Sequence, residues 1–373
     1  MGKKLRIAIL FNQPVSGAGE ERQYVSESGQ LKKGPAQPKR SAKETPLPRL
    51  TPTRQMIDLS EVGVLEEMED IKGALNSLGY RTTILNVDSD IDRLYAFLKE
   101  ERPDLVFNLV ESVENEAILE MNVAGVYELL KISYTGAGPL ALGTALNKPR
   151  VKEILTAHGI RTPRSQVFEP AGKLSVDPAM KYPLFVKPAR EDASVGISDD
   201  SVVSSLAELR KRVRYIFEEF EQPALVEQYI DGREINVALL GNRPPVAMPI
   251  SEIDFSGLTA GMHKIVSYEA KWMHGTVAYE GTKGVCPAVL PAAVESRVKS
   301  IALRCFELIG CRDYARVDFR LSKDNVPYVL EVNPNPDISD DAGFARSARS
   351  HGLTFSETIG KIVEAALQRC QVR

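Results

Sequence analysis

Apolar and polar positions in the first third of the chain switch between strand-like and helix-like spacing. Short apolar runs predict strands at about residues 5–11, 82–87 and 104–110. Apolar positions at helical spacing predict helices at about residues 64–78, 91–99 and 117–130. This alternation of strands and helices predicts a parallel sheet covered by helices.

Residues 12–60 interrupt that pattern. They combine Gly, Pro, Ser and charged residues without periodicity, and the stretch 31–52 is especially rich in proline. We expect this insertion to be mostly loop or disorder. Loops of this length inside a compact domain often serve as lids or binding loops. The sequence does not assign a role to the Pro-rich stretch.

The remainder of the chain mixes helices with strands that lie close together in sequence. Strands are expected at 182–188, near 197–203, at 224–230 and at 234–240, and mostly antiparallel strands from there to about 335. Helices are expected at 148–158, 205–220, near 291–309 and at about 355–368. The predicted fold class is therefore α/β followed by α+β.

Composition and charge are those of an ordinary globular protein. The 373 residues exceed the usual size of one core, so two or three domains are expected, and 43% of the residues are hydrophobic and 26% charged. A net charge of −3 without a long basic run argues against nucleic-acid binding. No apolar run is long enough for a membrane span or a signal peptide core, which predicts a cytoplasmic protein.

The cysteines do not suggest a metal or disulfide framework. The four cysteines contain no CxxC pair. Cys305 and Cys311 flank a predicted helix end, where we expect buried thiols.

The strongest chemical signal is a predicted hairpin formed by residues 314–321 and 328–336. Side chains alternate along a strand, so Glu331 and Asn333 share one face, as do Arg316 and Asp318. If the strands pair, three oxygen ligands and a cation converge. Such a set suits Mg²⁺ carrying a nucleotide. A hairpin with a solvated polar face is the alternative.

Three other segments carry weaker signals. In the loop 187–196, Lys187 and small residues such as Ser194 are suited to phosphate, although polar hairpin loops are common. The strands around 226–234 carry Glu227 and Glu234, which are acceptors suited to amine and ribose hydroxyl groups. The alternative is that both are solvated acids. Lys271 lies beside aromatic residues and is otherwise a surface lysine.

In this order the motifs closely resemble an ATP-grasp ligase, and within that superfamily a D-alanine–D-alanine ligase. The resemblance covers the chain from about Asp104 to the C-terminus. The segments that carry it are Tyr134-Thr135-Gly136, Asn147-Lys148, Phe185-Val186-Lys187-Pro188, Ser194-Val195-Gly196, Glu227 with Glu234, Tyr268-Glu269-Ala270-Lys271, Arg316-Val317-Asp318 and Glu331-Val332-Asn333.

The resemblance implies a role for each matching residue. Lys148, Lys187 and Lys271 would contact ATP phosphates, and the loop around Ser194 would close over them. Arg316 would stabilise the oxyanion of the tetrahedral intermediate. The metal ligands would be Asp318, Glu331 and Asn333, holding two Mg²⁺ or Mn²⁺. Adenine and ribose would be held by Glu227, Gln228, Tyr229, Ile230, Glu234 and Leu330.

The chain departs from this family where the amino-acid substrates bind. The motif after the first strand that holds the first substrate's ammonium is missing, although Glu20 is a candidate replacement. Ala193 stands where the phosphate loop usually has serine, and Ala342 stands near a serine that helps hold the second substrate's carboxylate. The residues then available to recognise the acceptor are Asp337, Asp340, Asp341 and Arg346.

The sequence thus predicts an ATP-grasp fold with a pre-ATP-grasp domain at 1–136, a lid domain at 137–226 and a metal-binding domain at 227–373. The predicted activity is ADP-forming ligation of a carboxylate to an amine, with amino acids or small peptides as substrates. The alternatives are an authentic D-alanine–D-alanine ligase and a non-catalytic ATP-binding protein. The resemblance also suggests a homodimer. The identity and chirality of the substrates stay open.

Overall fold

The computed structural model describes residues 4–12, 21–25, 31–35 and 63–371, except 89, 115, 171 and 173. Its N-terminal sheet is parallel, as predicted, with the strand order β4-β1-β5. The elements of this part are β1 (Arg6–Phe11), α1 (Val64–Ser77), β4 (Arg81–Asn86), α2 (Ile91–Glu101), β5 (Leu105–Leu109) and α3 (Glu120–Leu130). α2 begins where Asp90 accepts a hydrogen bond from the Arg93 backbone N–H at 2.9 Å.

Within residues 12–60, which the sequence predicts to be mostly loop, two short segments form strands. β2 (Glu21–Val25) and β3 (Leu31–Pro35) pair as antiparallel strands. Tyr24 and Val25 supply strand-forming residues, and pairing with a partner strand overrides the polar composition. The candidate Glu20 and the rest of the Pro-rich stretch lie outside the described residues.

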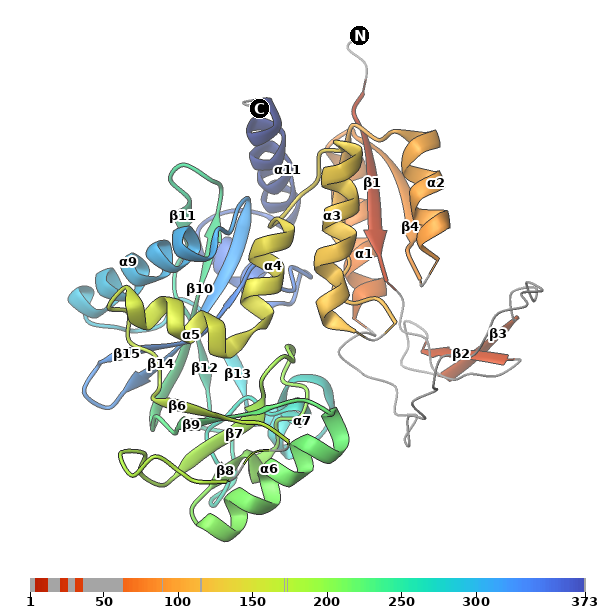
Figure 1. Cartoon of the computed structure of the whole chain (residues 1–373). Helices are drawn as coiled ribbons and strands as arrows, with labels where there is room; N and C mark the ends of the chain where they lie inside the picture. Colours follow the sequence, from red (N-terminus) through yellow and green to blue (C-terminus); the bar gives the residue numbers. More distant parts are fainter. Residues whose placement is uncertain are drawn as a thin grey trace.

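A four-stranded sheet with the order β6-β9-β7-β8 forms the central part of the chain. Its elements are β6 (Ser165–Phe168), β7 (Leu184–Pro188), β8 (Val202–Val203), α6 (Leu206–Phe220) and β9 (Ala224–Gln228). The predicted strand at 197–203 is wrong over most of its length, because residues 199–201 form a turn of 3₁₀-helix in which Ser198 and Ser201 cap each other. This sheet has a hydrophobic core of its own, and Figure 1 shows it with α6 at the lower end of the molecule.

The largest sheet is antiparallel and has the order β13-β12-β10-β14-β15, with β11 paired to β10. Its strands are β10 (Gly232–Leu240), β11 (Val246–Ala247), β12 (Ser251–Asp254), β13 (Lys283–Val285), β14 (Tyr314–Ser322) and β15 (Pro327–Asn333). The helices of this region are α4 (Pro139–Leu146), α5 (Lys148–Ala157), α7 (Tyr268–Trp272), α8 (Val277–Glu280), α9 (Ala292–Ile309), α10 (Gly343–Ser350) and α11 (Phe355–Gln371).

Four of these helices were not expected from the sequence: α4, α7, α8 and α10. α7 and α8 replace part of the predicted run of strands, and each is too short for a helical repeat to be recognised. They begin where Ser267 and Thr276 cap them.

The N-terminal and largest sheets share their cores, whereas the central sheet stands apart. Alternate residues of β1 enter two different clusters: Ala8 and Leu10 join one with Phe319, and Ile7 and Ile9 join another with Phe344. β1 and α1, near the start of the chain, therefore share a core with α11, near its end (Figure 1). The domain boundaries at 136 and 226 stay a prediction.

Candidate active site

The predicted hairpin of β14 and β15 is confirmed, and its pairing brings the polar residues together. In the antiparallel register Asp318 lies opposite Glu331, and Arg316 lies opposite Asn333. The register shifts between Asp318 and Phe319, which marks a bulge directly after the acid. Residues directly opposite on one face are close enough to act together.

Arg316 holds Asp318 in a fork. Its Nε and Nη2 donate to the two carboxylate oxygens at 2.7 and 2.8 Å. Burial still raises the pKa of Asp318 above its ordinary value, and the nearby Glu331 adds to this. Burial also opposes ionisation of Glu331, but Lys148, Lys187 and Arg316 outweigh it and lower the pKa of Glu331 to about 2. Glu331 is therefore a permanent negative charge at neutral pH.

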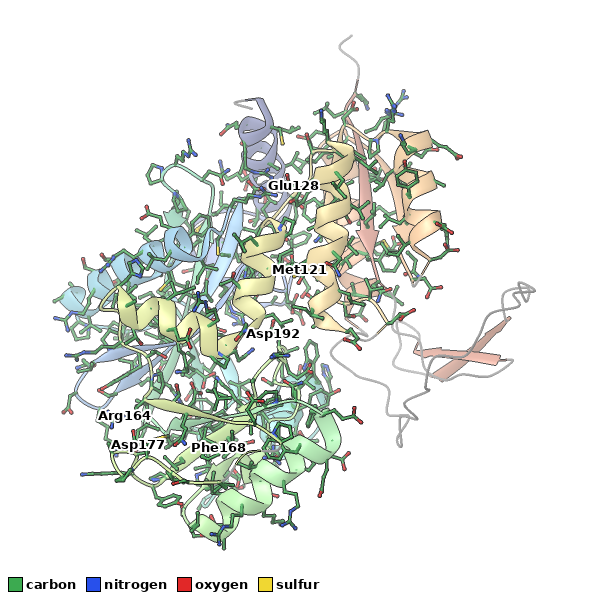
Figure 2. The ribbon with its side chains drawn as sticks, in the orientation of Figure 1. Met121, Glu128, Arg164, Phe168, Asp177 and Asp192 are labelled. Carbon is green, nitrogen blue, oxygen red and sulfur yellow. The ribbon has the colours of Figure 1, made fainter. Side chains whose placement is uncertain are left out.

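Lys148 connects this hairpin with the central sheet. Asn147 caps α5 by accepting a hydrogen bond from the Arg150 backbone N–H at 3.1 Å, so Lys148 is the first residue of the helix. The buried ammonium of Lys148 lies 2.5 Å from Asp192, in the loop after β7, and 3.6 Å from Glu331 on β15. In Figure 2, Asp192 is labelled where this loop comes close to α5.

Glu227 lies between two lysines inside the protein. Only 2% of Glu227 is exposed, and its two oxygens lie 2.6 Å from Lys152 and 2.9 Å from Lys187. Burial opposes the charge of Glu227, but the two lysines lower its pKa below the ordinary value. Burial lowers the pKa of Lys152 in turn. Glu227 of β9, Lys187 of β7 and Lys152 of α5 thus form a compact triad of ions that joins the central sheet to the helix that carries Lys148.

The loop after β7 is fastened to α7. Ser194 has a left-handed backbone (φ +63°) and donates its hydroxyl to the carbonyl of Val266 at 3.0 Å. The indole N–H of Trp272 donates to the carbonyl of Ala193 at 2.9 Å. Lys271 lies with its ammonium 4.7 Å from the centre of the Trp272 ring. The loop that carries Ser194 is therefore held against α7, the helix that carries Lys271.

Most of the residues predicted around adenine lie along the connection from β9 to β10, whereas Leu330 lies on β15. Burial raises the pKa of Glu234, whose oxygen is 3.5 Å from Arg320. The ring of Tyr229 lies 5.5 Å from the same guanidinium. Gln228 instead exchanges hydrogen bonds with the backbone of Lys181, so its side chain supports the start of β7. The remaining two predicted residues, Ile230 and Leu330, are half-buried.

The oxygen ligands of the β14–β15 hairpin fit a metal ion that is bound together with a nucleotide better than a metal ion that is bound by the protein alone. Among the described residues, no group of three or more His, Cys, Asp or Glu side chains could hold an ion. Asp318, Glu331 and Asn333 supply two acids and one amide, and the Asn333 oxygen also accepts the backbone N–H of Asn335 at 3.0 Å. Mg²⁺ typically takes one or two carboxylates and completes its shell with phosphate and water.

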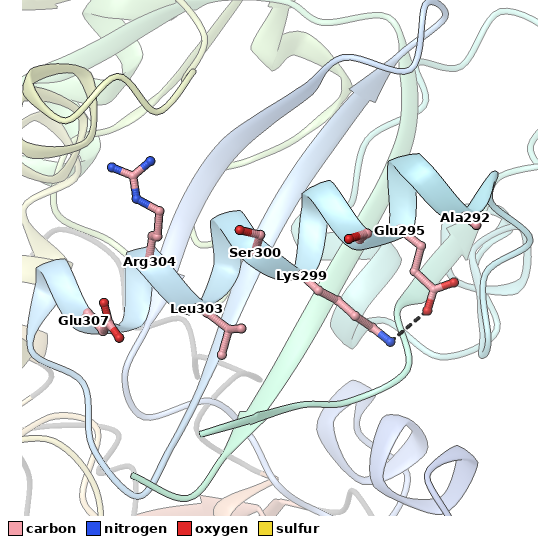
Figure 3. A pocket seen from close by; sticks show the side chains of 8 residues that line it. Ala292, Glu295, Lys299, Ser300, Leu303, Arg304 and Glu307 are labelled. Carbon is pink, nitrogen blue, oxygen red and sulfur yellow. Dashed lines mark hydrogen bonds and ion pairs between the residues drawn. The ribbon is translucent and has the colours of Figure 1, made fainter. Parts of the chain in front are cut away.

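A hollow elsewhere does not compete with this site. A hollow of about 570 Å³ lies along the outer face of α9, and Figure 3 shows that its lining residues belong to this one helix. Its charged side chains include the pair Glu295–Lys299 at 2.7 Å. Since one helix face lines it, groups from different elements do not converge there as they do at Lys148.

Comparison with known proteins assigns the family. The family profile described as D-ala D-ala ligase C-terminus matches residues 155–364, more than half of the chain. The chain belongs to the D-alanine–D-alanine ligase family. It is 30% identical to the D-alanine–D-alanine ligase of Pelotomaculum thermopropionicum, over 83% of this chain and 93% of the relative. It is 32% identical to the uncharacterized protein y4sG of Sinorhizobium fredii, over 81% of this chain and 87% of that one.

Solved structures confirm the ATP-grasp fold. The D-alanine–D-alanine ligase from Bacillus anthracis complexed with ATP superimposes with a TM-score of 0.69, at 22% identity and 99% coverage of both chains. The protein is thus an ATP-dependent, ADP-forming carbon–nitrogen ligase, as the motifs predicted. None of the helices in the described part of the chain has the length and apolarity needed to cross a bilayer.

Three charged residues of the site were missed from the sequence. Lys152 lies one helical turn after Lys148, and both are buried, so helical spacing of the two lysines was the available signal. Arg320 continues the alternation of Arg316 and Asp318 along β14, which places it on the same face. Asp192 carried no such signal, because only folding brings its loop to Lys148.

Proposed function

We propose that this family member joins amino acids or small peptides by activating a carboxylate with ATP and passing it to an amine. The observation that carries the proposal is the position of Lys148 between Asp192 of the phosphate loop and Glu331 of the metal hairpin. A buried cation that bridges two sheets at this point is suited to a polyphosphate lying between them.

The residues divide into those for phosphate, base and metal. Lys148, Lys187 and Lys271 would neutralise the phosphates, and the loop at Ser194 would cover them. Glu227, Glu234 and the chain from Gln228 to Ile230, with Leu330, would hold the nucleoside. Each carboxylate oxygen of Glu227 already has a lysine ammonium beside it. When ATP binds, a group of the nucleotide would therefore take the place of one of these two ammonium groups.

The metal residues fit two Mg²⁺ or Mn²⁺ held with the nucleotide. Glu331 would be a ligand, since its pKa of about 2 keeps it charged. Asp318 and Asn333 would complete the protein's share. Bound Mg²⁺ would offset the charge of the phosphates and orient the γ-phosphate.

The chemistry requires positioning rather than a protein nucleophile. The substrate carboxylate attacks the γ-phosphorus, an acylphosphate forms and ADP leaves. The amine then attacks the acyl carbon, and inorganic phosphate leaves. Arg316 is held by Asp318 beside the metal residues, where a guanidinium can stabilise the oxyanion of the tetrahedral intermediate.

The substrates are a separate proposal, because the segment after β15 is built differently from the family pattern. Asn335 accepts the hydroxyl of Tyr314 at 2.7 Å and donates to Glu120 at 2.9 Å. Glu67 of α1 accepts the backbone N–H of Ile338 at 2.9 Å. These contacts shape the substrate side with residues that the family motif does not contain, and they favour substrates other than two D-alanines. The relatives' names keep D-alanine–D-alanine ligation as the second candidate.

An ADP-release assay separates these candidates. Purified protein would be given ATP, Mg²⁺ and D-alanine alone, and then pairs of other amino acids and dipeptides, with phosphate release measured in parallel. We expect D-alanine alone to be turned over more slowly than the best other pair. Comparable rates would establish the second candidate, and an absence of ATP-dependent product with every pair would contradict ligation.

The metal assignment has its own test in Glu331→Gln. This change keeps the volume and removes the ligand charge, so Mg²⁺-dependent turnover should fall by more than about 100-fold while the fold is retained, since even outer partners of a ligand contribute about 10- to 100-fold. Asp324→Asn is the matched control, because Asp324 is exposed in the turn of the same hairpin. Equal activity of Glu331→Gln and the control would refute the assignment.

The proposals of a homodimer and of a cytoplasmic location rest on family resemblance and composition. Sedimentation of the purified chain tests the first, and fractionation of the source cells tests the second.

A further inference from the structure

Arg320 is a buried cation to which the proposed function gives no part. It lies on β14 directly opposite Glu234 of β10, on the strand face that also carries Arg316 and Asp318. Only 4% of Arg320 is exposed, and its Nη1 lies 3.5 Å from a carboxylate oxygen of Glu234. A guanidinium withdrawn from water destabilises a fold unless its N–H groups find partners, so the contacts of Arg320 indicate what it does.

The guanidinium of Arg320 joins two segments that are far apart in the sequence. On one side, Nη1 donates to the carbonyl of Gly232 at 3.4 Å, and the centre of the Tyr229 ring lies 5.5 Å from the guanidinium carbon. On the other side, Nη2 donates to the carbonyl of Lys264, and the centre of the Phe255 ring lies 5.7 Å away. Arg320 thus ties the connection from β9 to β10 to the segment that follows β12, and these contacts fix its position.

The fixed guanidinium holds Glu234 by charge without using up its oxygens. Their separation of 3.5 Å is longer than the distance of about 2.7–2.9 Å in a charge-assisted hydrogen bond, so the carboxylate keeps acceptor capacity for a ligand. Burial raises the pKa of Glu234, and Arg320 opposes this rise. An ionised carboxylate is an acceptor at both oxygens, so it is suited to a pair of neighbouring hydroxyl groups.

We propose that Arg320 is a positioning residue that holds Glu234 toward the ribose hydroxyls and thereby sets a preference for ribonucleotides over deoxyribonucleotides. The inference rests on the proposed function, in which Glu234 holds the nucleoside, and deepens it. A nucleotide that lacks a hydroxyl leaves an acceptor of the half-buried acid unpaired, and such a site rejects the shorter ligand. Without Arg320 the carboxylate is free to turn away, which weakens the contact with the hydroxyls and not the contacts with base or phosphates.

Calorimetric binding of three diphosphates tests the preference without turnover. ADP, 2′-deoxy-ADP and 3′-deoxy-ADP are titrated into the full-length protein in the presence of Mg²⁺. We expect ADP to bind at least about tenfold more tightly than one of the two deoxy analogues, the factor that a hydrogen bond to a charged group provides. Equal binding of all three nucleotides overturns the proposal, and an absence of binding by any of them contradicts the nucleotide site as well.

Arg320→Met separates positioning from a merely structural role. Methionine keeps an unbranched apolar side chain and removes the charge, so ADP should bind more weakly while the rejected deoxy analogue binds as before, and the preference should disappear. Glu234→Gln should reduce the preference in the same way, and the double variant should reduce it no further, because both residues act through one contact. If Arg320→Met instead weakens all three nucleotides by the same factor, Arg320 only supports the fold and the proposal is wrong.

Two further variants complete the test. Arg233→Met is the matched control, because Arg233 precedes Glu234 on β10 and pairs with Glu252 at 2.5 Å on the opposite strand face; it should keep the full preference. Arg320→Lys retains a charge near Glu234 and should keep part of the preference. If Arg320→Met does not fold, Glu234→Gln and Arg320→Lys decide, and a preference that neither of them changes overturns the proposal.

The ADP-release assay keeps this result separate from the proposed function. A ribose preference that Arg320→Met abolishes, without turnover of any substrate pair, supports the role of Arg320 and contradicts ligation. Turnover in which the unmodified protein uses ATP and both deoxy-ATP analogues with equal kcat/KM supports ligation and overturns the role of Arg320.

Discussion

Replacement of Glu227 by glutamine isolates the energetic role of the buried triad. The change keeps the shape of the side chain but leaves Lys152 and Lys187 without their common counter-charge. The two N···O distances are 2.6 and 2.9 Å. At an effective dielectric constant of about 20, each contact corresponds to roughly 6 kcal/mol of attraction.

Desolvation of three buried ions offsets most of that attraction. Removal of one partner from a buried pair typically costs about 3–5 kcal/mol, because the remaining charge stays buried and uncompensated. We therefore expect Glu227→Gln to lower the free energy of unfolding by about 3–5 kcal/mol. Chemical denaturation followed by circular dichroism measures this, with the transition of the central sheet analysed separately if unfolding is not two-state.

The pH dependence of the stability of Glu227→Gln provides a second test of the triad. Burial lowers the pKa of Lys152, so the folded protein binds fewer protons there than the unfolded chain. The free-energy cost of burying the charged form of Lys152 is present in full below its pKa in the folded protein. This cost disappears as the pH rises toward the pKa of the same lysine in the unfolded chain. The loss of unfolding free energy in Glu227→Gln should therefore become smaller between pH 7 and about pH 10.

Arg150→Gln is a suitable control, because it breaks an exposed pair with Glu153 on the same helix at 2.8 Å. Exposed pairs contribute about 0–1 kcal/mol. Glu227→Gln could instead lower the free energy of unfolding by less than about 1 kcal/mol, with the same loss at pH 7 and at pH 10. That result would refute the triad as a buried electrostatic unit.

Three further results are expected. Gly196→Ala should raise the KM for ATP several-fold, because Gly196 has φ +72° and a Cβ would lie 2.7 Å from the ring of Pro188; an unchanged KM would contradict a closed phosphate loop. Cys305 and Cys311 should resist alkylation at pH 8 in the folded protein and react after unfolding, because burial raises the pKa of each thiol to about 12; rapid labelling of both would disprove their burial. Trp272 is the single tryptophan, so nucleotide binding should change the intrinsic fluorescence as the loop that it anchors moves; an unaltered spectrum at saturating ATP would argue against coupling.

The meeting of Asp318 and Glu331 could be predicted because the two residues are close in sequence. Asp318 and Glu331 lie on consecutive strands joined by a short turn, so strand alternation alone puts them on one face. The order of the lysine, acid and amide motifs then identified the family. Local pattern was sufficient here because the geometry follows from one hairpin.

Short helices and short strands were the elements predicted least well. α7 was expected to be part of a run of strands, because a helix of five residues leaves no repeat in the sequence. The two-residue strand β8 follows a capped turn instead of the longer strand expected there. In both places side-chain caps and tertiary contacts decide the backbone, and these outweigh weak propensities.

The sequence by itself determined the hairpin, the parallel N-terminal sheet and the class of reaction. The tertiary structure alone decided which charges meet. It placed Lys152 beside Glu227 and brought Asp192 to Lys148. The physical reason is that periodicity tells which face of a strand or helix a side chain occupies, whereas its partner on another element depends on how the sheets and helices pack.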